Sequence, residues 1–169
     1  MNRQHVVDAL FTSLARTEER LHPDAILLPN FPRSIQLDYY SCGAKSTYMV
    51  LKYFGKCCTP ESVERELDTD EDGTSPSDIK RVLRKHGLKV HVNTDMGLRD
   101  LRKAISAGSP VLVSLYEGWH YSVVYGYLDK YIFVMNPSLC EMGSLKVAVT
   151  LSEWRKIFDR WGVVVGSND

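Results

Sequence analysis

One cysteine of this chain, Cys42, stands where a thiol can do chemistry. It begins a predicted helix that runs to Phe54, with Gly55 as the stop. The positive end of the helix dipole favours a thiolate over a thiol. The same position directs the backbone N–H of Cys42 outward, where it can bind an oxyanion. Cys42 is therefore a candidate nucleophile.

Two neighbours of Cys42 bear on this interpretation. Gln36 stands six residues upstream and can add a side-chain amide donor to an oxyanion hole. Gly43 lets the backbone lie close to a substrate and is a candidate cleft residue. An isolated Cys-Gly pair is more simply a buried helix cysteine, but Gln36 at this spacing favours catalysis.

A nucleophilic thiol needs a general base, and His120 is the candidate. It begins a predicted strand directly after Trp119, which is a candidate cleft residue. The alternative is a structural strand histidine. The other four histidines lie in the N-terminal segment, near a helix end or in an alternating strand, and are interpreted as surface or packing residues: His5, His22, His86 and His91.

Asn136 is the candidate partner of His120. Predicted strands over 120–127 and 131–136 form a hairpin, and both residues lie eight positions from Leu128, inside the predicted turn. With an odd number of loop residues, the two side chains share a face, directly opposite or one diagonal step apart. Asn136 would then accept a hydrogen bond from the imidazole. The alternative is that Asn136-Pro137 is only a turn dipeptide.

The surrounding elements indicate an α+β fold. Further helices are predicted from Thr59-Pro60 and Ser75-Pro76, where a capping residue precedes proline, and over 96–108 and 151–160. Short strands are predicted over 88–93 and from residue 111 onward. Helices followed by consecutive strands predict an antiparallel sheet facing a helical layer. Residues 1–34, with a helix over 3–20 followed by an irregular, proline-rich stretch, are expected to be an extension packed on the domain formed by 35–169.

Length and composition fit one globular domain. The chain has 169 residues, 44% hydrophobic and 25% charged, with 21 basic and 21 acidic side chains. This balance argues against a nucleic-acid or anionic-membrane partner. No apolar run reaches the ~20 residues of a membrane span, and Asp8 and Arg16 interrupt any signal-peptide core. We expect a cytoplasmic protein.

Metal and cofactor motifs are weak. The four cysteines, at 42, 57, 58 and 140, contain no C-x-x-C pair, so no zinc site and no cofactor are expected. The segment from Asp68 to Gly73 matches the first half of a calcium loop, but Ile79 stands where glutamate should be. A solvated acidic loop is the simpler interpretation.

The ordered motifs Q-x-D-x-x-x-C-G, G-W-H-Y-S-V-V-Y-G-Y and I-F-V-M-N-P resemble the bacteriocin-processing peptidases. These are papain-like enzymes that cut leader peptides after a double glycine. The resemblance covers roughly 35–165 and implies Cys42 as nucleophile, His120 as base, Asn136 as orienting residue and Gln36 in the oxyanion hole. The orienting residue is usually Asp in that family; Asn stands here, as in papain.

The expected function is therefore that of a cysteine peptidase acting on a peptide or protein through a thioacyl intermediate, with Gly-Gly as a candidate site. Two alternatives stay open. One is a related acyltransferase or transglutaminase-like enzyme using the same residues, and the other is a non-catalytic peptide-binding module. The sequence does not specify an oligomeric state.

Overall fold

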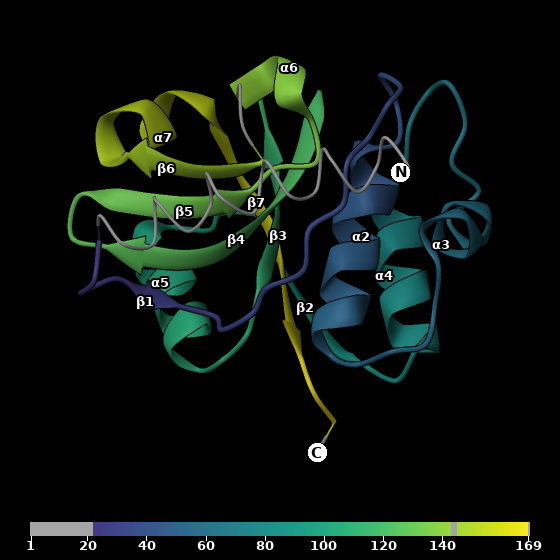
Figure 1. Ribbon diagram of the computed structural model, residues 1–169, viewed down its shortest axis with the longest axis horizontal. Coiled ribbons are helices and arrows are strands. Elements are labelled where there is room, and N and C mark those ends of the chain that lie inside the picture. The colour runs from purple at the N-terminus through teal and green to yellow at the C-terminus, as the bar shows by residue number, and fades with distance from the viewer. Residues whose placement is uncertain (1–21, 143–144, 169) are drawn as a thin grey trace, which may run out of the picture.

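The structure is a computed structural model, which describes residues 22–142 and 145–168. The predicted helix over 3–20 lies outside these residues. Within them, three helices stand beside one part of an antiparallel sheet, and three further helices lie along the rest of it (Figure 1). The expected α+β class is confirmed. No helix of the described segments is long and apolar enough to cross a membrane.

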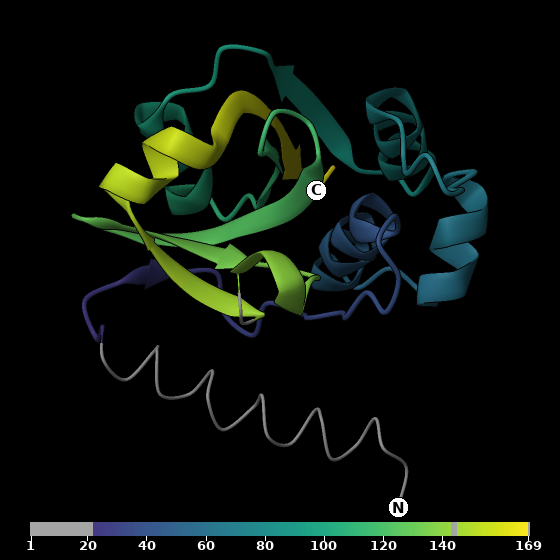
Figure 2. The same cartoon turned by 90° about the horizontal axis from the view of Figure 1, so that it is seen from above.

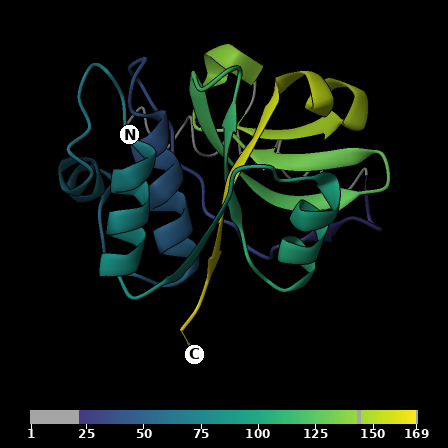
Figure 3. The same cartoon turned by 180° about the vertical axis from the view of Figure 1, so that it is seen from behind.

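The first helical layer forms where the capping signals predict it. Its members are α2 (Cys42–Tyr53), α3 (Pro60–Glu66) and α4 (Pro76–Lys85). Thr59 and Ser75 accept hydrogen bonds from backbone N–H groups in the first turns of α3 and α4, and proline follows each cap. Seen from behind, α4 and α2 lie side by side (Figure 3).

In the described part of the chain, seven strands form the sheet, and each of their pairings is antiparallel. The order along the sheet is β2-β7-β3-β4-β5-β6, and β1 pairs separately with β4. The strands are β1 (Ile26–Leu27), β2 (Lys89–Asn93), β3 (Val111–Leu115), β4 (His120–Leu128), β5 (Tyr131–Met135), β6 (Lys146–Thr150) and β7 (Phe158–Gly166).

The remaining helices are α5 (Leu98–Ser106), α6 (Leu139–Met142) and α7 (Leu151–Ile157). Helix α5 packs on β3 and β4, and α7 packs on β5 and β6, away from the α2–α4 layer (Figure 2). The sequence does not predict α6, which is a single short turn of four residues. Helices this short carry too little periodicity to be recognised.

The contact between α2 and β4 positions the site. Met49, Val50 and Leu51 of α2 are fully buried in the same core as Val123 of β4. Burying each of these side chains contributes about 1.5–3 kcal/mol. At the other end of the helix, Ser46 Oγ donates to the backbone oxygen of Tyr121 at 3.1 Å. The first turn of α2 therefore lies against the start of β4.

The proline-rich segment is more regular than expected. Ile26 and Leu27 form β1 and pair with Tyr127 and Gly126 of β4. The N–H of Leu28 then donates to the oxygen of Tyr125 at 2.7 Å. The expectation of a wholly irregular stretch was wrong here, because an isolated two-residue strand is set by its tertiary partner and not by its own propensity. The boundary between 34 and 35 stays a prediction.

Candidate active site

Cys42 is the first residue of α2, where the helix dipole presents its positive end. Ser41 stands at the N-cap, but its hydroxyl donates to Asp38 Oδ2 at 2.8 Å and does not cap the first turn. No acidic residue lies in that turn. The dipole of α2 therefore acts on the Cys42 sulfur without a nearby carboxylate in the same turn, which favours the thiolate.

Asp38 organises the loop that leads into Cys42. Its Oδ1 accepts hydrogen bonds from the backbone N–H groups of Tyr40, at 2.9 Å, and Ser41, at 2.7 Å. Burial of Asp38 acts to raise the pKa of its carboxyl, but the bonds from Ser41 and Tyr40 and the charge of Lys45 outweigh it, so that the pKa lies below its usual value. Asp38 is therefore an ionised anchor for this loop.

Gln36 lies inside the same loop. Its side-chain Nε2 donates to the backbone oxygen of Asp38 at 2.9 Å, and its backbone N–H donates to the oxygen of Pro137 at 2.9 Å. The side chain is buried, and its Oε1 has no hydrogen-bond partner among the described residues. The bond that the Gln36 N–H donates to Pro137 ties the Gln36 loop to the segment that follows β5, which carries Asn136.

His120 and Asn136 are in direct contact. His120 Nε2 lies 2.7 Å from Asn136 Oδ1, and both side chains are buried. An amide oxygen only accepts, so Nε2 carries the hydrogen and the neutral ring has its lone pair on Nδ1. The pair therefore selects the tautomer in which Nδ1 is the basic nitrogen.

Asn136 is itself held on several sides. Its Oδ1 also accepts from the N–H of Ser138 at 3.2 Å and from Ser122 Oγ at 3.4 Å. Its Nδ2 donates to the oxygen of Ser138, and its backbone N–H donates to the oxygen of Leu145 at 2.7 Å. Ser122 was not singled out from the sequence. The signal was available, because a serine two positions after His120 shares its face of the strand.

The route by which His120 and Asn136 meet differs from the expected one. Leu128 is the last residue of β4 and pairs with Tyr131, so the turn has two residues and not an odd number. A register shift between Val124 and Gly126 inserts one residue into β4. Such a bulge reverses the facing of all residues beyond it. His120 then shares a face with Asn136, one diagonal step from the residue opposite.

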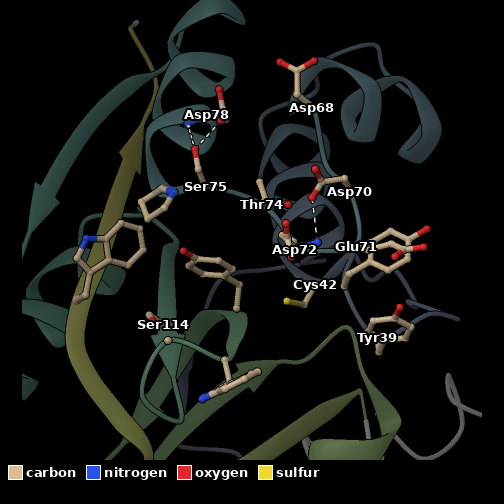
Figure 4. A pocket seen from close by; sticks show the side chains of 17 residues that line it. Tyr39, Cys42, Asp68, Asp70, Glu71, Asp72, Thr74, Ser75, Asp78 and Ser114 are labelled. Atoms are coloured by element: carbon tan, nitrogen blue, oxygen red, sulfur yellow. Dashed lines mark hydrogen bonds between the residues drawn. The ribbon is translucent and has the colours of Figure 1, made fainter.

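A cleft of about 790 Å³ opens at Cys42. Figure 4 shows the Cys42 sulfur directed into it, with Asp72 and Thr74 on one side and Ser114 on the other. The acidic loop before α4 forms one wall, and the turn between β3 and β4 forms the opposite wall with Gly118 and Trp119. Trp119, which was expected in the cleft, lines it and is 85% exposed.

Gly43 is buried and is not among the residues that line the cleft. A Cβ at this position would lie 2.7 Å from Thr74 Cβ and 3.1 Å from Tyr121 Cδ2. The missing side chain thus lets Thr74 and Tyr121, which both line the cleft, pack against the backbone beside Cys42. Burial raises the pKa of Tyr121 to about 12, with further contributions from the negative charges of Cys42 and Asp159.

The acidic loop forms a turn and not a metal cage. Asp70 Oδ1 accepts from the N–H of Asp72 at 2.9 Å, and Gly73 has φ 95°, a conformation that favours glycine. Across the described ranges, no three His, Cys, Asp or Glu side chains are grouped so that they can hold a metal ion.

The fold and the site together define a papain-like cysteine peptidase domain, with a cysteine at a helix start facing a histidine-bearing antiparallel sheet. The model of the peptidase C39 family matches residues 30–167, and the chain belongs to this family. No curated protein matches the sequence.

Solved structures share this fold. A double-glycine motif protease from an AMS/PCAT transporter, in complex with the leader peptide, is 22% identical over 79% of this chain and 89% of its own, with a TM-score of 0.68. The peptidase domain of Streptococcus ComA is 16% identical over 82% and 100%, with a TM-score of 0.71. A putative C39-like peptidase from Bacillus anthracis is 16% identical over 86% and 99%, also at 0.71.

Proposed function

We propose that this protein is a cysteine peptidase in which Cys42 is the nucleophile, His120 the general base and Asn136 the residue that orients His120. The observation that carries the proposal is the 2.7 Å contact between His120 Nε2 and Asn136 Oδ1. It leaves Nδ1 as the nitrogen that takes the thiol proton, and it lies at the start of the strand beside the first turn of α2.

The proposed reaction has two halves. The Cys42 thiolate attacks the carbonyl carbon of the scissile bond, and the carbonyl oxygen becomes an oxyanion. The backbone N–H of Cys42 and the Gln36 amide donate hydrogen bonds to it. His120 gives its proton to the leaving amine as the C–N bond breaks, which leaves a thioester on Cys42. Water, deprotonated by His120, then attacks the thioester, releases the acid and restores the thiol.

The substrate we propose is a peptide with small residues before the cut, and Gly-Gly in particular. Thr74 and Tyr121 close in on Gly43 next to the nucleophile, so the adjoining part of the cleft favours residues without a large side chain. The double-glycine motif protease among the similar structures was solved with a leader peptide, which agrees in kind. The exposed Trp119 at the rim supplies an apolar contact for the peptide.

A reducing compartment such as the cytoplasm suits this chemistry. A catalytic thiol must stay reduced, and none of the four cysteines, all of which the structure describes, forms a disulfide. Two of them, Cys57 and Cys140, are exposed. We therefore propose a cytoplasmic location.

The test is cleavage of a peptide library with mass-spectrometric readout, comparing the wild type with Cys42→Ala. We expect cuts mainly after Gly or Ala in the wild type and none in the variant. Cuts mainly after large or charged residues would contradict the substrate assignment. Binding of Gly-Gly peptides without cleavage by either protein would instead favour a peptide-binding module, and transfer of the acyl group to an added amine in preference to water would indicate an acyltransferase.

A further inference from the structure

We infer that Asp159 is a positioning residue of this active site, acting on His120 and the cleft wall through the turn between β3 and β4. The inference rests on the proposed function, since it concerns the same Cys42–His120 chemistry. Asp159 lies in β7, far along the chain from that turn.

The turn that Asp159 contacts is strained. It consists of the four residues 116–119 between Leu115 and His120. Tyr116 and Glu117 have φ of 57° and 60°, and Gly118 has φ of 89°. A non-glycine residue in this left-handed region is conformationally strained. The conformation therefore needs contacts from outside the turn to hold it.

One carboxylate supplies most of these contacts. Asp159 Oδ1 accepts from the N–H of Glu117 at 2.8 Å, and Oδ2 accepts from the N–H of Gly118 at 2.9 Å. Oδ2 also accepts from Ser114 Oγ at 2.6 Å, and Ser114 is buried in the preceding strand. Hydrogen bonds to an ionised acceptor are roughly twice as strong as neutral ones. Asp159 thus holds the middle of the strained turn and ties it to the strand that precedes it.

The backbone of β7 is shaped to place this side chain. The pairing of β3 with β7 shifts register between Val113 and Leu115, opposite Asp159. The next residue, Arg160, has φ of 60°. Bulges beside active sites commonly serve to aim a side chain. Tyr116 N–H also donates to the oxygen of Ile157 at 2.8 Å, which joins the same two segments.

On the proposed mechanism, the turn carries and positions residues of the active site. Gly118 and Trp119 line the cleft, and His120 follows them directly. Ser114 lines the cleft as well, opposite Cys42 in Figure 4. Asp159 makes no ion pair with a described residue, so its charge is balanced by the donors of the turn. Displacing the turn would displace the imidazole relative to the thiol.

Asp159 affects the reactivity of Cys42 in two opposite ways, through its own charge and through the position of the turn, and an experiment can separate them. Asp159 accepts a hydrogen bond from Ser114, which lines the same cleft as Cys42, so the negative charge of Asp159 opposes a thiolate there. Removing that charge alone would make the thiolate easier to form and alkylation at acidic pH faster. Releasing the turn would misplace His120 and make alkylation slower.

The experiment measures the rate of alkylation of Cys42 by iodoacetamide against pH in Asp159→Asn, Ser114→Ala and the wild type, by mass mapping. Asp129→Asn is the matched control, because it removes the same charge from the exposed turn at the far end of β4. We expect the rate at pH 6 to fall about tenfold in Asp159→Asn and two- to threefold in Ser114→Ala, with no change in the control.

An unchanged or faster rate in folded Asp159→Asn would overturn the inference, since the carboxylate would then act only by its charge or not at all. If Asp159→Asn does not fold, Ser114→Ala decides, and a wild-type rate in that variant overturns the inference. Failure of the proposed function is seen separately, as a wild-type Cys42 that reacts no faster than Cys57 or Cys140.

Discussion

His120 Nε2 and Asn136 Oδ1 lie 2.7 Å apart inside the protein, and both side chains are buried. This contact has a direction, because Asn136 Oδ1 can only accept and His120 Nε2 must therefore donate. The imidazole is held by one nitrogen and presents the other, Nδ1, as the base. The proposed division of roles between Cys42, His120 and Asn136 follows from that direction.

Asn136→Ala should slow acylation roughly tenfold or somewhat more, because one orienting hydrogen bond is worth about 1–2 kcal/mol. Asn136→Asp should retain activity, since its oxygen accepts the same bond. The new charge should raise the pKa of His120 and extend activity to higher pH. The measurement is kcat/KM against pH for the wild type and both variants.

Stability must be followed in the same variants, since the Asn136 side chain also bonds Ser138 and Ser122. Full activity in Asn136→Ala, or complete loss in a folded Asn136→Asp, would show that Asn136 does not orient the base. The control is Asn93→Ala, which removes an amide whose Oδ1 accepts from the N–H of Asp95 at an exposed position.

Gln36→Ala should lower kcat by roughly 10²–10³ with KM little changed, because an oxyanion-hole donor acts in the transition state and not on the bound substrate. The structure adds that Gln36 Nε2 also donates to the oxygen of Asp38. Steady-state kinetics should therefore be paired with a measurement of the free energy of unfolding. Normal turnover in the variant would assign Gln36 a structural role only.

The stability that Asp38 contributes should depend on pH. The pKa of its carboxyl is lowered in the folded protein, so the contribution is fully present above the unfolded pKa, ~3.9. It is lost as the pH falls through the lower, folded pKa. Urea unfolding of the wild type and Asp38→Asn should differ at pH 7 and converge toward pH 3. An equal difference at both pH values would mean that the ionised form is not what anchors the loop.

Gly43→Ala should destabilise the protein by about 1–3 kcal/mol, because the added methyl group would meet Thr74 Cβ at 2.7 Å. Thr74→Gly removes that atom and should recover part of the loss when combined with Gly43→Ala, although Tyr121 still lies at 3.1 Å. Unfolding free energies of the four proteins give the coupling. Additive losses would show that Thr74 and Gly43 are not in the predicted contact.

Local signals in the sequence predict much of this fold. Thr59-Pro60 and Ser75-Pro76 fix two helix starts, because each cap satisfies a backbone donor within its own turn. The sequence predicts that His120 and Asn136 share a face, but from a loop with an odd number of residues. In the structure the loop has two residues, and the bulge near Tyr125 supplies the extra residue instead. Bulges are set by packing across strands, which a single sequence does not display.

Asp159 was not predicted at all, because its hydrogen bonds reach the turn at Glu117 and Gly118 across a distance of more than forty residues. Nothing near Asp159 in the sequence marks it as different from an ordinary surface acid. By contrast, Cys42 and Gln36 lie in one short segment, and their spacing alone suggests an oxyanion hole. Residues that act through local geometry are therefore predictable here, and those that act across the sheet are not.

Solvent exposure of the four cysteines and the proposed activation of Cys42 predict opposite orders of thiol reactivity. Cys57 and Cys140 are exposed, whereas Cys42 is buried, with 8% of its surface exposed. Burial also raises the pKa of the Cys58 thiol, which disfavours its reaction. Brief treatment with iodoacetamide at neutral pH followed by mass mapping ranks all four. We predict that Cys42 is labelled first and that His120→Ala abolishes this preference. Labelling of Cys57 or Cys140 with Cys42 untouched would contradict it.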